Sequence, residues 1–172
     1  MRIFCGGSWP GLIRECETSM AKVLPGHSVG RVRCVGWTEV HGNWKHRPCL
    51  FPQHGSGKKH ERAIALGPWQ QEIVDARPEP FVRGLIHSDG CRINNRDRRR
   101  VGSGWKYYEY PRYQFTNVSE DIVGLLTDAL DRLGISWKSH RSPQPQRLDK
   151  IIVSMSKKAA VARMDEFVGP KY

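Results

Sequence analysis

The sequence predicts an α+β fold of two related halves, each in the order strand, helix, strand, strand. Short stretches in which polar and apolar residues alternate predict antiparallel strands with one covered face, and stretches with apolar residues at helical spacing lie between them. The halves also align with each other. Residues 2–5 correspond to residues 112–115 and, after three extra loop residues in the second half, Lys45 corresponds to Lys158. Such self-similarity is typical of a duplicated unit.

The first half contains a strand, a helix opened by Pro10 and two further strands, and a short helix follows it. These elements are expected at residues 2–5, 10–24, 29–40 and 68–76. In the first strand of the pair, Arg31 and Arg33 alternate with Val32 and Cys34. This alternation predicts that both arginines lie on a solvent-facing side of the sheet.

The second half repeats this order and adds a helix and a strand in front of it. Ser119 and Ser156 are the expected caps of its second and third helices. Helices are expected at residues 80–88, 120–133 and 157–167, strands at 91–95, 107–116, 135–140 and 148–155, and an arginine-dense loop at 96–100. The complete unit is therefore α-β-β-α-β-β-α, and the first copy lacks its opening helix and strand. The expected domains are a shortened first repeat (1–66), a linker with a short helix (67–79) and a complete second repeat (80–172).

Composition points to an anionic partner. The 172 residues include 28 Lys and Arg against 17 Asp and Glu, a net charge of +11. Nucleic acid is the leading candidate, with an anionic membrane surface second. No apolar run is long enough to span a membrane. The five cysteines are scattered and form no Cys-x-x-Cys pair, which disfavours zinc and disulfide frameworks and predicts a cytoplasmic location.

Residues 82–90 carry the most informative motif. They resemble the nine-residue signature of the LAGLIDADG homing endonucleases, with identities at Gly84, Leu85, Ile86, Asp89 and Gly90. His87 departs from the signature at its first acidic position, and Ser88 replaces another small residue. Gly84 and Ser88 are four residues apart and share one helix face, where small side chains allow a partner helix to pack closely. The resemblance extends over the repeat order of residues 80–167.

The resemblance implies a catalytic role for Asp89. In that family two such helices bring two aspartates together at the DNA surface. Like charges so close need cations between them, so Mg²⁺ is the implied cofactor, with Asp89 and a backbone oxygen near Ser88 as ligands. Mg²⁺ would activate a water and stabilise the leaving 3′ oxygen. The alternative interpretation is that Asp89 only ends a helix in an Asp-Gly turn.

The same resemblance implies a basic residue near the junction of the last strand and last helix of each repeat. Lys158 and its counterpart Lys45 are the candidates for polarising the phosphate or the water. Lys157 lies beside Lys158. A surface lysine at the start of a helix is the alternative interpretation of each.

The strands are expected to form a saddle for double-stranded DNA, because Arg suits guanine edges and Asn or Gln suits adenine edges. The candidates for base contact are Arg92, Asn94, Arg112, Gln114 and Thr116, with Arg31 and Arg33 in the first half. The candidates for phosphate contact are Arg96, Arg98, Arg99, Arg100 and Lys106, and more weakly Lys58, Lys59 and Arg62. A solvated charged loop is the alternative for the arginine run.

The candidate functions differ in how many LAGLIDADG-like motifs ending in an acidic residue they require. Only Asp89 is present, whereas a single-chain two-repeat nuclease needs a second acid. A longer gene, a homodimer through the Gly84 and Ser88 face, and an inactive relic are the three explanations considered. A site-specific DNA endonuclease is favoured, and a non-catalytic DNA-binding regulator and a maturase-like RNA-binding protein are the alternatives. The histidines at 41, 46, 54 and 60 match no metal-ligand spacing.

Overall fold

The computed structural model describes residues 1–53, 62–145 and 148–172. The sequence-predicted phosphate contacts Lys58 and Lys59 lie outside these residues, as do His54 and His60. The chain forms two compact units. Unit 1 comprises Met1–Ser56 with Pro170–Tyr172, and unit 2 comprises Gly57–Gly169. No helix in the described part of the chain is long and apolar enough to cross a membrane.

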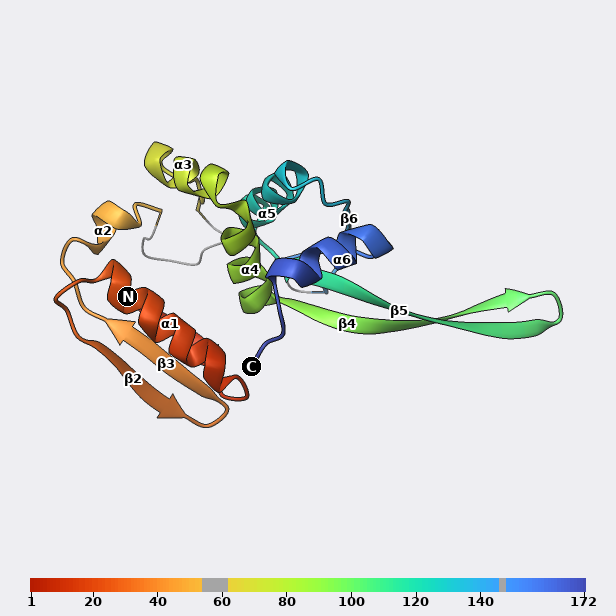
Figure 1. Cartoon of the computed structure of the whole chain (residues 1–172), viewed down its shortest axis with the longest axis horizontal. Coiled ribbons are helices and arrows are strands. Elements are labelled where there is room, and N and C mark those ends of the chain that lie inside the picture. The colour runs from red at the N-terminus through yellow and green to blue at the C-terminus, as the bar shows by residue number, and fades with distance from the viewer. Residues whose placement is uncertain (54–61, 146–147) are drawn as a thin grey trace. The chain divides into compact units, whose positions relative to one another are not determined.

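Unit 1 is a three-stranded antiparallel sheet with one long helix across one face (Figure 1). Its elements are β1 (Arg2–Gly6), α1 (Pro10–Val23), β2 (Val29–Cys34), β3 (Trp37–Gly42) and α2 (Arg47–Leu50). The strand order is β1-β3-β2. Ile13, Met20 and Leu24 of the helical segment pack with Val40 of β3. Gly42 permits this approach, because a Cβ there would lie 2.5 Å from Leu24 Cδ1.

Unit 2 is a four-stranded antiparallel sheet with helices on one side (Figure 1). Its elements are α3 (Pro68–Ala76), α4 (Pro78–Asp89), β4 (Gly90–Val101), β5 (Gly104–Asn117), α5 (Glu120–Arg132), β6 (Lys138–Ser142), β7 (Lys150–Met155) and α6 (Lys158–Phe167). From α4 to α6 the order is α-β-β-α-β-β-α, as predicted. The strand order is β4-β5-β7-β6.

The two sheets confirm the duplication. The order β1-β3-β2 in unit 1 has the same topology as β5-β7-β6 in unit 2, and α1 corresponds to α5. Unit 1 has no counterpart of α4 and β4 among its described residues. The fold is therefore the predicted pair of repeats, with the first copy lacking the opening helix and strand.

The core of unit 2 lies between its sheet and α4, α5 and α6. Tyr113 and Phe115 of β5 are buried, and they alternate with side chains that remain partly accessible. Val153 and Met155 of β7 extend the same buried face. The helices contribute Val82, Ile86, Leu126, Leu130 and Met164. Ser119 caps α5 as predicted, because its hydroxyl accepts a hydrogen bond from the Ile122 amide at 3.4 Å.

Several predicted boundaries were wrong, and the short helix α2 was not predicted. The arginine-dense segment is not a loop: β4 continues through it to Val101 and turns at Gly102, whose φ of 61° favours glycine. Pairing with the aromatic residues of β5 supplies the cross-strand partners that keep this segment extended. Helix α4 begins two residues earlier than predicted, at Pro78, a residue suited to the first helical turn. Lys157, rather than Ser156, occupies the N-cap position of α6, with no side-chain cap.

Truncation of a central side chain should destabilise unit 2 strongly. Phe115 is fully buried on β5, so Phe115→Ala should lower the free energy of unfolding by about 3–5 kcal/mol. Urea denaturation followed by circular dichroism measures this loss. Val101→Ala, at an exposed position of the same hairpin, is the control and should change stability by less than about 0.5 kcal/mol. Equal losses in both variants would contradict the assigned core.

Candidate nucleic-acid interface

The sheet of unit 2 has an open face, on the side away from α4, α5 and α6. Because Tyr113 and Phe115 point to the helices, Arg112, Gln114 and Thr116 of β5 point to the open face, as predicted. Paired residues of antiparallel strands share a face. The register adds Cys91, Ile93, Ser154, Ile152, Lys138 and His140. None of these side chains is a carboxylate.

One polar row crosses all four strands of this open face. Cys91 pairs with Gln114, Gln114 with Ser154, and Ser154 with Lys138. Sequence reasoning missed Lys138, Ser154 and His140, although the alternation of Lys138 and His140 in a predicted strand was a usable signal. The row combines donors and acceptors along one line of the sheet, a combination suited to the edges of nucleic-acid bases.

Arg112 has unmet hydrogen-bonding capacity on the open face. Its Nε is buried and has no acceptor among the described residues. Buried donors in folded proteins are nearly always paired, so this donor is available to an acceptor from water or from a bound ligand. A base edge or a phosphate oxygen would supply that acceptor.

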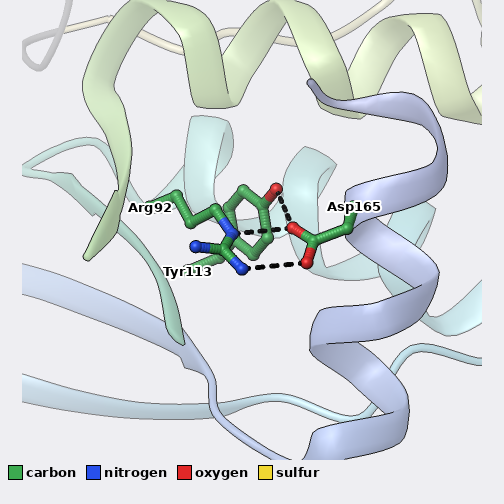
Figure 2. Close-up of polar contacts among 3 residues, drawn as sticks. All are labelled: Arg92, Tyr113 and Asp165. Carbon is green, nitrogen blue, oxygen red and sulfur yellow. Dashed lines mark hydrogen bonds and ion pairs between the residues drawn. The ribbon is translucent and has the colours of Figure 1, made fainter. Parts of the chain in front are cut away.

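The predicted face of β4 was wrong. Arg92 lies on the helix side, where its Nε and one terminal nitrogen donate to the two carboxylate oxygens of Asp165 on α6, at 2.8 and 3.0 Å (Figure 2). Tyr113, the cross-strand partner of Arg92, donates its hydroxyl to the same carboxylate at 2.7 Å. By strand alternation, Asn94 also faces this side, and Ile93 faces the open side. Arg92 therefore anchors α6 to the sheet.

This network shifts the pKa of each of its members. Hydrogen bonds from Arg92, and then from Tyr113, lower the pKa of Asp165 below its ordinary value. Hydrogen bonding to Asp165 raises the pKa of Arg92. Burial, and then the Asp165 carboxylate, raises the pKa of Tyr113. All three shifts favour a charged ion pair beside a neutral phenol.

The predicted solvent face of β2 was also wrong. Arg31 pairs across the sheet with Val40, whose side chain packs under α1, so Arg31 and Arg33 are on the helix side. The Arg31 guanidinium binds Glu17 of α1, with Nε 2.7 Å from the carboxylate. Val32 is exposed on the other face. The ion pair with Glu17 stabilises Arg31 on the helix side. The alternation of residues within the strand does not reveal this partner.

Asp89 is the last residue of α4 and is exposed. Its Oδ2 accepts a hydrogen bond from Asn117 Nδ2 at 3.0 Å. Asn117 ends β5, is only 6% exposed, and uses its Oδ1 to accept from the Ser119 amide at 3.0 Å. Asn117 therefore orients the Asp89 carboxylate while being fixed by the start of α5. Asn117 was not identified from the sequence. Its position two residues before the Ser119 cap was the only feature of the sequence that pointed to it.

The predicted packing face of α4 is accessible. Gly84 and Ser88 are exposed, and within unit 2 a methyl group added to Gly84 would meet no atom within 4 Å. The Ser88 hydroxyl donates to the Leu85 carbonyl at 2.9 Å. This face can therefore receive another helix.

The two candidate lysines occupy equivalent places in their repeats. Lys45 and Lys158 are exposed and each follows the last strand of its repeat, β3 or β7, by three residues. Lys158 follows β7 and is the first residue of α6, while Asp89 directly precedes β4. In the sheet, β5 lies between β4 and β7. Lys157 reaches the Ser136 hydroxyl at 3.4 Å.

Arg62 precedes α3, and the other described residues predicted to contact phosphates lie along the β4–β5 hairpin. Arg96 is 4.0 Å from Glu109, Arg99 is 3.6 Å from Asp97, and Arg98 stacks 4.7 Å from the centre of the Trp105 ring. Asp97 therefore neutralises one arginine, as expected. Glu109 is the partner of Arg96, and the Trp105 ring is the partner of Arg98. Among the described residues there is no group of three or more His, Cys, Asp or Glu side chains that could hold a metal ion.

The Asp165 network generates a test by pH. At neutral pH, Asp165→Asn should cost no more than about 1 kcal/mol, because both partners are partly exposed. Since folding depresses the pKa of Asp165, this stabilisation is present above about pH 4 and is lost as the pH falls through the lowered pKa. Urea midpoints across a pH series should therefore converge for variant and wild type in acid. Asp128→Asn, at an exposed carboxylate of α5, is the matched control. A difference that does not change with pH would exclude the ion pair.

No protein-family model matches this sequence, and no curated protein matches it. Solved structures do. Mesophilic variants of the homing endonuclease I-DmoI align with 98% of this chain and 79% of that chain, with a TM-score of 0.57 and 11% identity. The LAGLIDADG meganuclease I-AabMI, solved with uncleaved DNA, aligns with 96% of this chain and 73% of that chain, with a TM-score of 0.54 and 10% identity.

A third structure, the homing endonuclease I-TnaI, aligns with 52% of this chain at 18% identity and a TM-score of 0.39. That alignment spans 56% of the I-TnaI chain. The α-β-β-α-β-β-α order, the repeated sheet topology and the two alignments over nearly the whole chain agree with one another. Together they show that this chain has the fold of the LAGLIDADG homing endonucleases.

Proposed function

We propose that this protein binds double-stranded DNA on the open face of unit 2 and contributes Asp89 to an Mg²⁺-dependent endonuclease site. The observation that carries the proposal is the polar, carboxylate-free open face, on which Arg112 has an unpaired buried Nε. A net charge of +11 supports a polyanionic partner. The meganuclease neighbour solved with DNA supports the same class of ligand.

Arg112, Gln114 and Thr116 are the proposed base-reading residues. They are successive open-face positions of one strand, and strands of a sheet can lie in the major groove of DNA. Arg suits guanine, Gln suits adenine and Thr suits a polar atom or the thymine methyl group. Lys138 and His140 lie on β6, which is separated from β5 by β7, and they would contact the phosphates on one side of the groove.

Asp89 fits one half of a shared Mg²⁺ site. Mg²⁺ binds carboxylate oxygens, carbonyls and water, and Asp89 with the Ser88 carbonyl offers two such ligands at the end of α4. Asn117 holds the carboxylate in one orientation. Bound Mg²⁺ supplies an activated water and charge stabilisation at the scissile phosphate. A second carboxylate is needed to complete the pair, and no cluster of three acidic or ligating side chains occurs within the described residues.

A homodimer through the Gly84 and Ser88 face of α4 would provide that second carboxylate. The face is exposed, and the absence of a side chain at Gly84 lets the backbone of a partner helix approach. Two copies packed in this way would place one Asp89 from each chain at the same end of the helix pair. Lys158 would then act near the phosphate from the start of α6.

A DNA-binding protein that does not cut is the second candidate function. The observation that favours it is that, among the described residues, Asp89 ends a single helix that carries the motif. The open face would bind DNA equally well in such a protein, so binding and cleavage need separate tests.

DNA recognition by the open face predicts a specific loss of affinity. Selection from a randomised duplex library should enrich a binding site, and Arg112→Ala or Gln114→Ala should weaken binding to that site by about 5- to 150-fold while relaxing the preference at one base pair. Fluorescence anisotropy measures the affinities. Arg163→Gln removes the same charge from helix α6 and should have little effect. Equal losses of DNA affinity for Arg112→Ala and Arg163→Gln would mean that Arg112 contributes only general electrostatic attraction and does not read a base.

Cleavage predicts that Asp89 and the α4 face act together. With Mg²⁺ and a plasmid carrying the enriched site, Asp89→Asn should retain DNA binding and lose about 10²- to 10³-fold in cutting rate, because a charge-stabilising group is removed. Gly84→Glu should fold normally, since the position is open, but should lose both the dimer and cutting. Gel assays measure cleavage and light scattering measures mass.

The controls separate the two proposals. Asp128→Asn, on α5, should cut at the wild-type rate. Equal cutting by Asp89→Asn and wild type would remove the role of Asp89. A wild-type protein that is strictly monomeric on DNA and still cuts would remove the dimer. Wild-type binding without any cleavage would favour the non-catalytic function.

A further inference from the structure

The β4–β5 hairpin extends well beyond the helices of unit 2 as a two-stranded ribbon (Figure 1). We call residues 95–110 the arm. Asn95 Nδ2 and the Tyr110 hydroxyl form a hydrogen bond of 2.9 Å at its base. The six residues 104–109 on the returning strand are all exposed. The arm therefore has no hydrophobic core to fill, and its aromatic residues need another explanation.

Trp105 and Tyr107 lie on one side of the arm, because they are two residues apart on β5. Their exposed fractions are 58% and 66%. Arg100 and Arg98 pair with them directly across the ribbon, and the Arg98 guanidinium also lies over the Trp105 ring, 4.7 Å from its centre. The side thus presents two accessible rings interleaved with two guanidinium groups.

The net positive charge of the arm favours a polyanionic ligand. It carries five Lys and Arg residues against two carboxylates, Asp97 and Glu109. Those carboxylates are engaged by Arg99 and Arg96 at 3.6 and 4.0 Å. Arg98 and Arg100 form no ion pair among the described residues, so the positive charge beside Trp105 and Tyr107 is uncompensated.

A pocket of about 320 Å³ opens on the arm, lined by Arg96, Tyr107, Tyr108 and Glu109. It is large enough for one planar base. Arg96 offers donors and Glu109 offers acceptors to the polar edge of such a base, and Tyr107 offers a ring face. The pocket therefore combines a ring face with hydrogen-bonding groups for the polar edge of a base.

We propose that the arm binds unpaired nucleotides of a nucleic-acid strand. The bases stack on Trp105 and Tyr107, and Arg98 and Arg100 neutralise the phosphates between them. Aromatic rings bind single strands in this way because every unpaired base exposes a flat face, whereas a duplex hides those faces between neighbouring base pairs. This site is separate from the open face, so it goes beyond the proposed duplex recognition and can fail independently of it.

A purely structural role for the rings is the competing explanation. Cross-strand pairs of cations and rings do stabilise isolated ribbons. That role accounts for Trp105 under Arg98 and for Tyr108, which lies near Arg99 and Lys106. It does not account for Tyr107, the most exposed ring of the arm, which forms no hydrogen bond or ring contact within the described residues.

The test uses the full chain and fluorescently labelled twelve-nucleotide strands, dT and rU, with a mixed-sequence duplex as comparison. Anisotropy titrations at fixed salt should show that Trp105→Ala and Tyr107→Ala each weaken binding to a single strand by about tenfold or more. Trp105→Phe should restore most of the affinity because a ring remains, and Trp105→Leu should not. Trp69→Ala, which removes a 44%-exposed tryptophan from α3, is the matched control and should have no effect.

Stronger binding of rU than of dT would assign the natural strand to RNA, and the reverse would assign it to DNA; either supports the proposal. Unchanged single-strand affinity in both arm variants would overturn it. So would equal losses for duplex and single strand, or a loss in Trp69→Ala as large as that in Trp105→Ala. Arg112→Ala should impair duplex binding alone, so failure of the duplex proposal is seen separately.

Discussion

The alternation of side chains along the last six residues of β5 is the constraint on which unit 2 depends. Tyr113 and Phe115 point inward and form the centre of the core, so Arg112, Gln114 and Thr116 must point outward. Asn117, the last inward residue, orients the carboxylate of Asp89. One strand thereby sets the core, the position of the acidic group and the polar surface. A shift of β5 by one residue in its pairing would move each of these side chains to the opposite face of the sheet.

The arginines of this basic chain fall into two physical classes. Arg92 and Arg31 lie on the helix sides of their sheets, where Asp165 and Glu17 pair with them and where they join helices to strands. Arg112, Arg98 and Arg100 form no ion pair among the described residues, whereas Arg96 and Arg99 of the arm lie 4.0 and 3.6 Å from Glu109 and Asp97. Net charge alone does not distinguish an arginine that stabilises the fold from one that binds a ligand. The neighbouring carboxylates do.

The two repeats share a topology but differ in the chemistry of their open sheet faces. In unit 1 this face carries Phe4 and Trp37, whose rings contact each other edge to face, and the exposed Val32. It also carries Arg2, His41 and a carboxylate, Glu39, which lies 3.5 Å from Arg2 and 3.6 Å from His41. In unit 2 the equivalent face carries Arg112, Gln114 and Lys138. The proposed base-reading surface is therefore a property of the second repeat, and duplication of the backbone did not preserve the side chains of the sheet.

Much of the architecture was predictable because its signals are local. The helical spacing of apolar residues, the proline starts, the Ser119 cap and the repeat from residues 2–5 to 112–115 depend on neighbours in the chain. The outward face of β5 was predictable too, since large apolar side chains at Tyr113 and Phe115 admit only one orientation. The motif helix that ends at Asp89 followed from its resemblance to a known signature.

The sequence by itself therefore determined the order of elements, the duplication and the face of β5. Tertiary structure decided the face of β4, because Arg92 is drawn to Asp165, a residue 73 positions away. It also decided that Asn117 meets Asp89 and that the arginine run is part of a ribbon. Alternation within a strand specifies two faces without saying which is covered. Where both faces carry polar groups, only the packed helix, with its own charges, makes that choice.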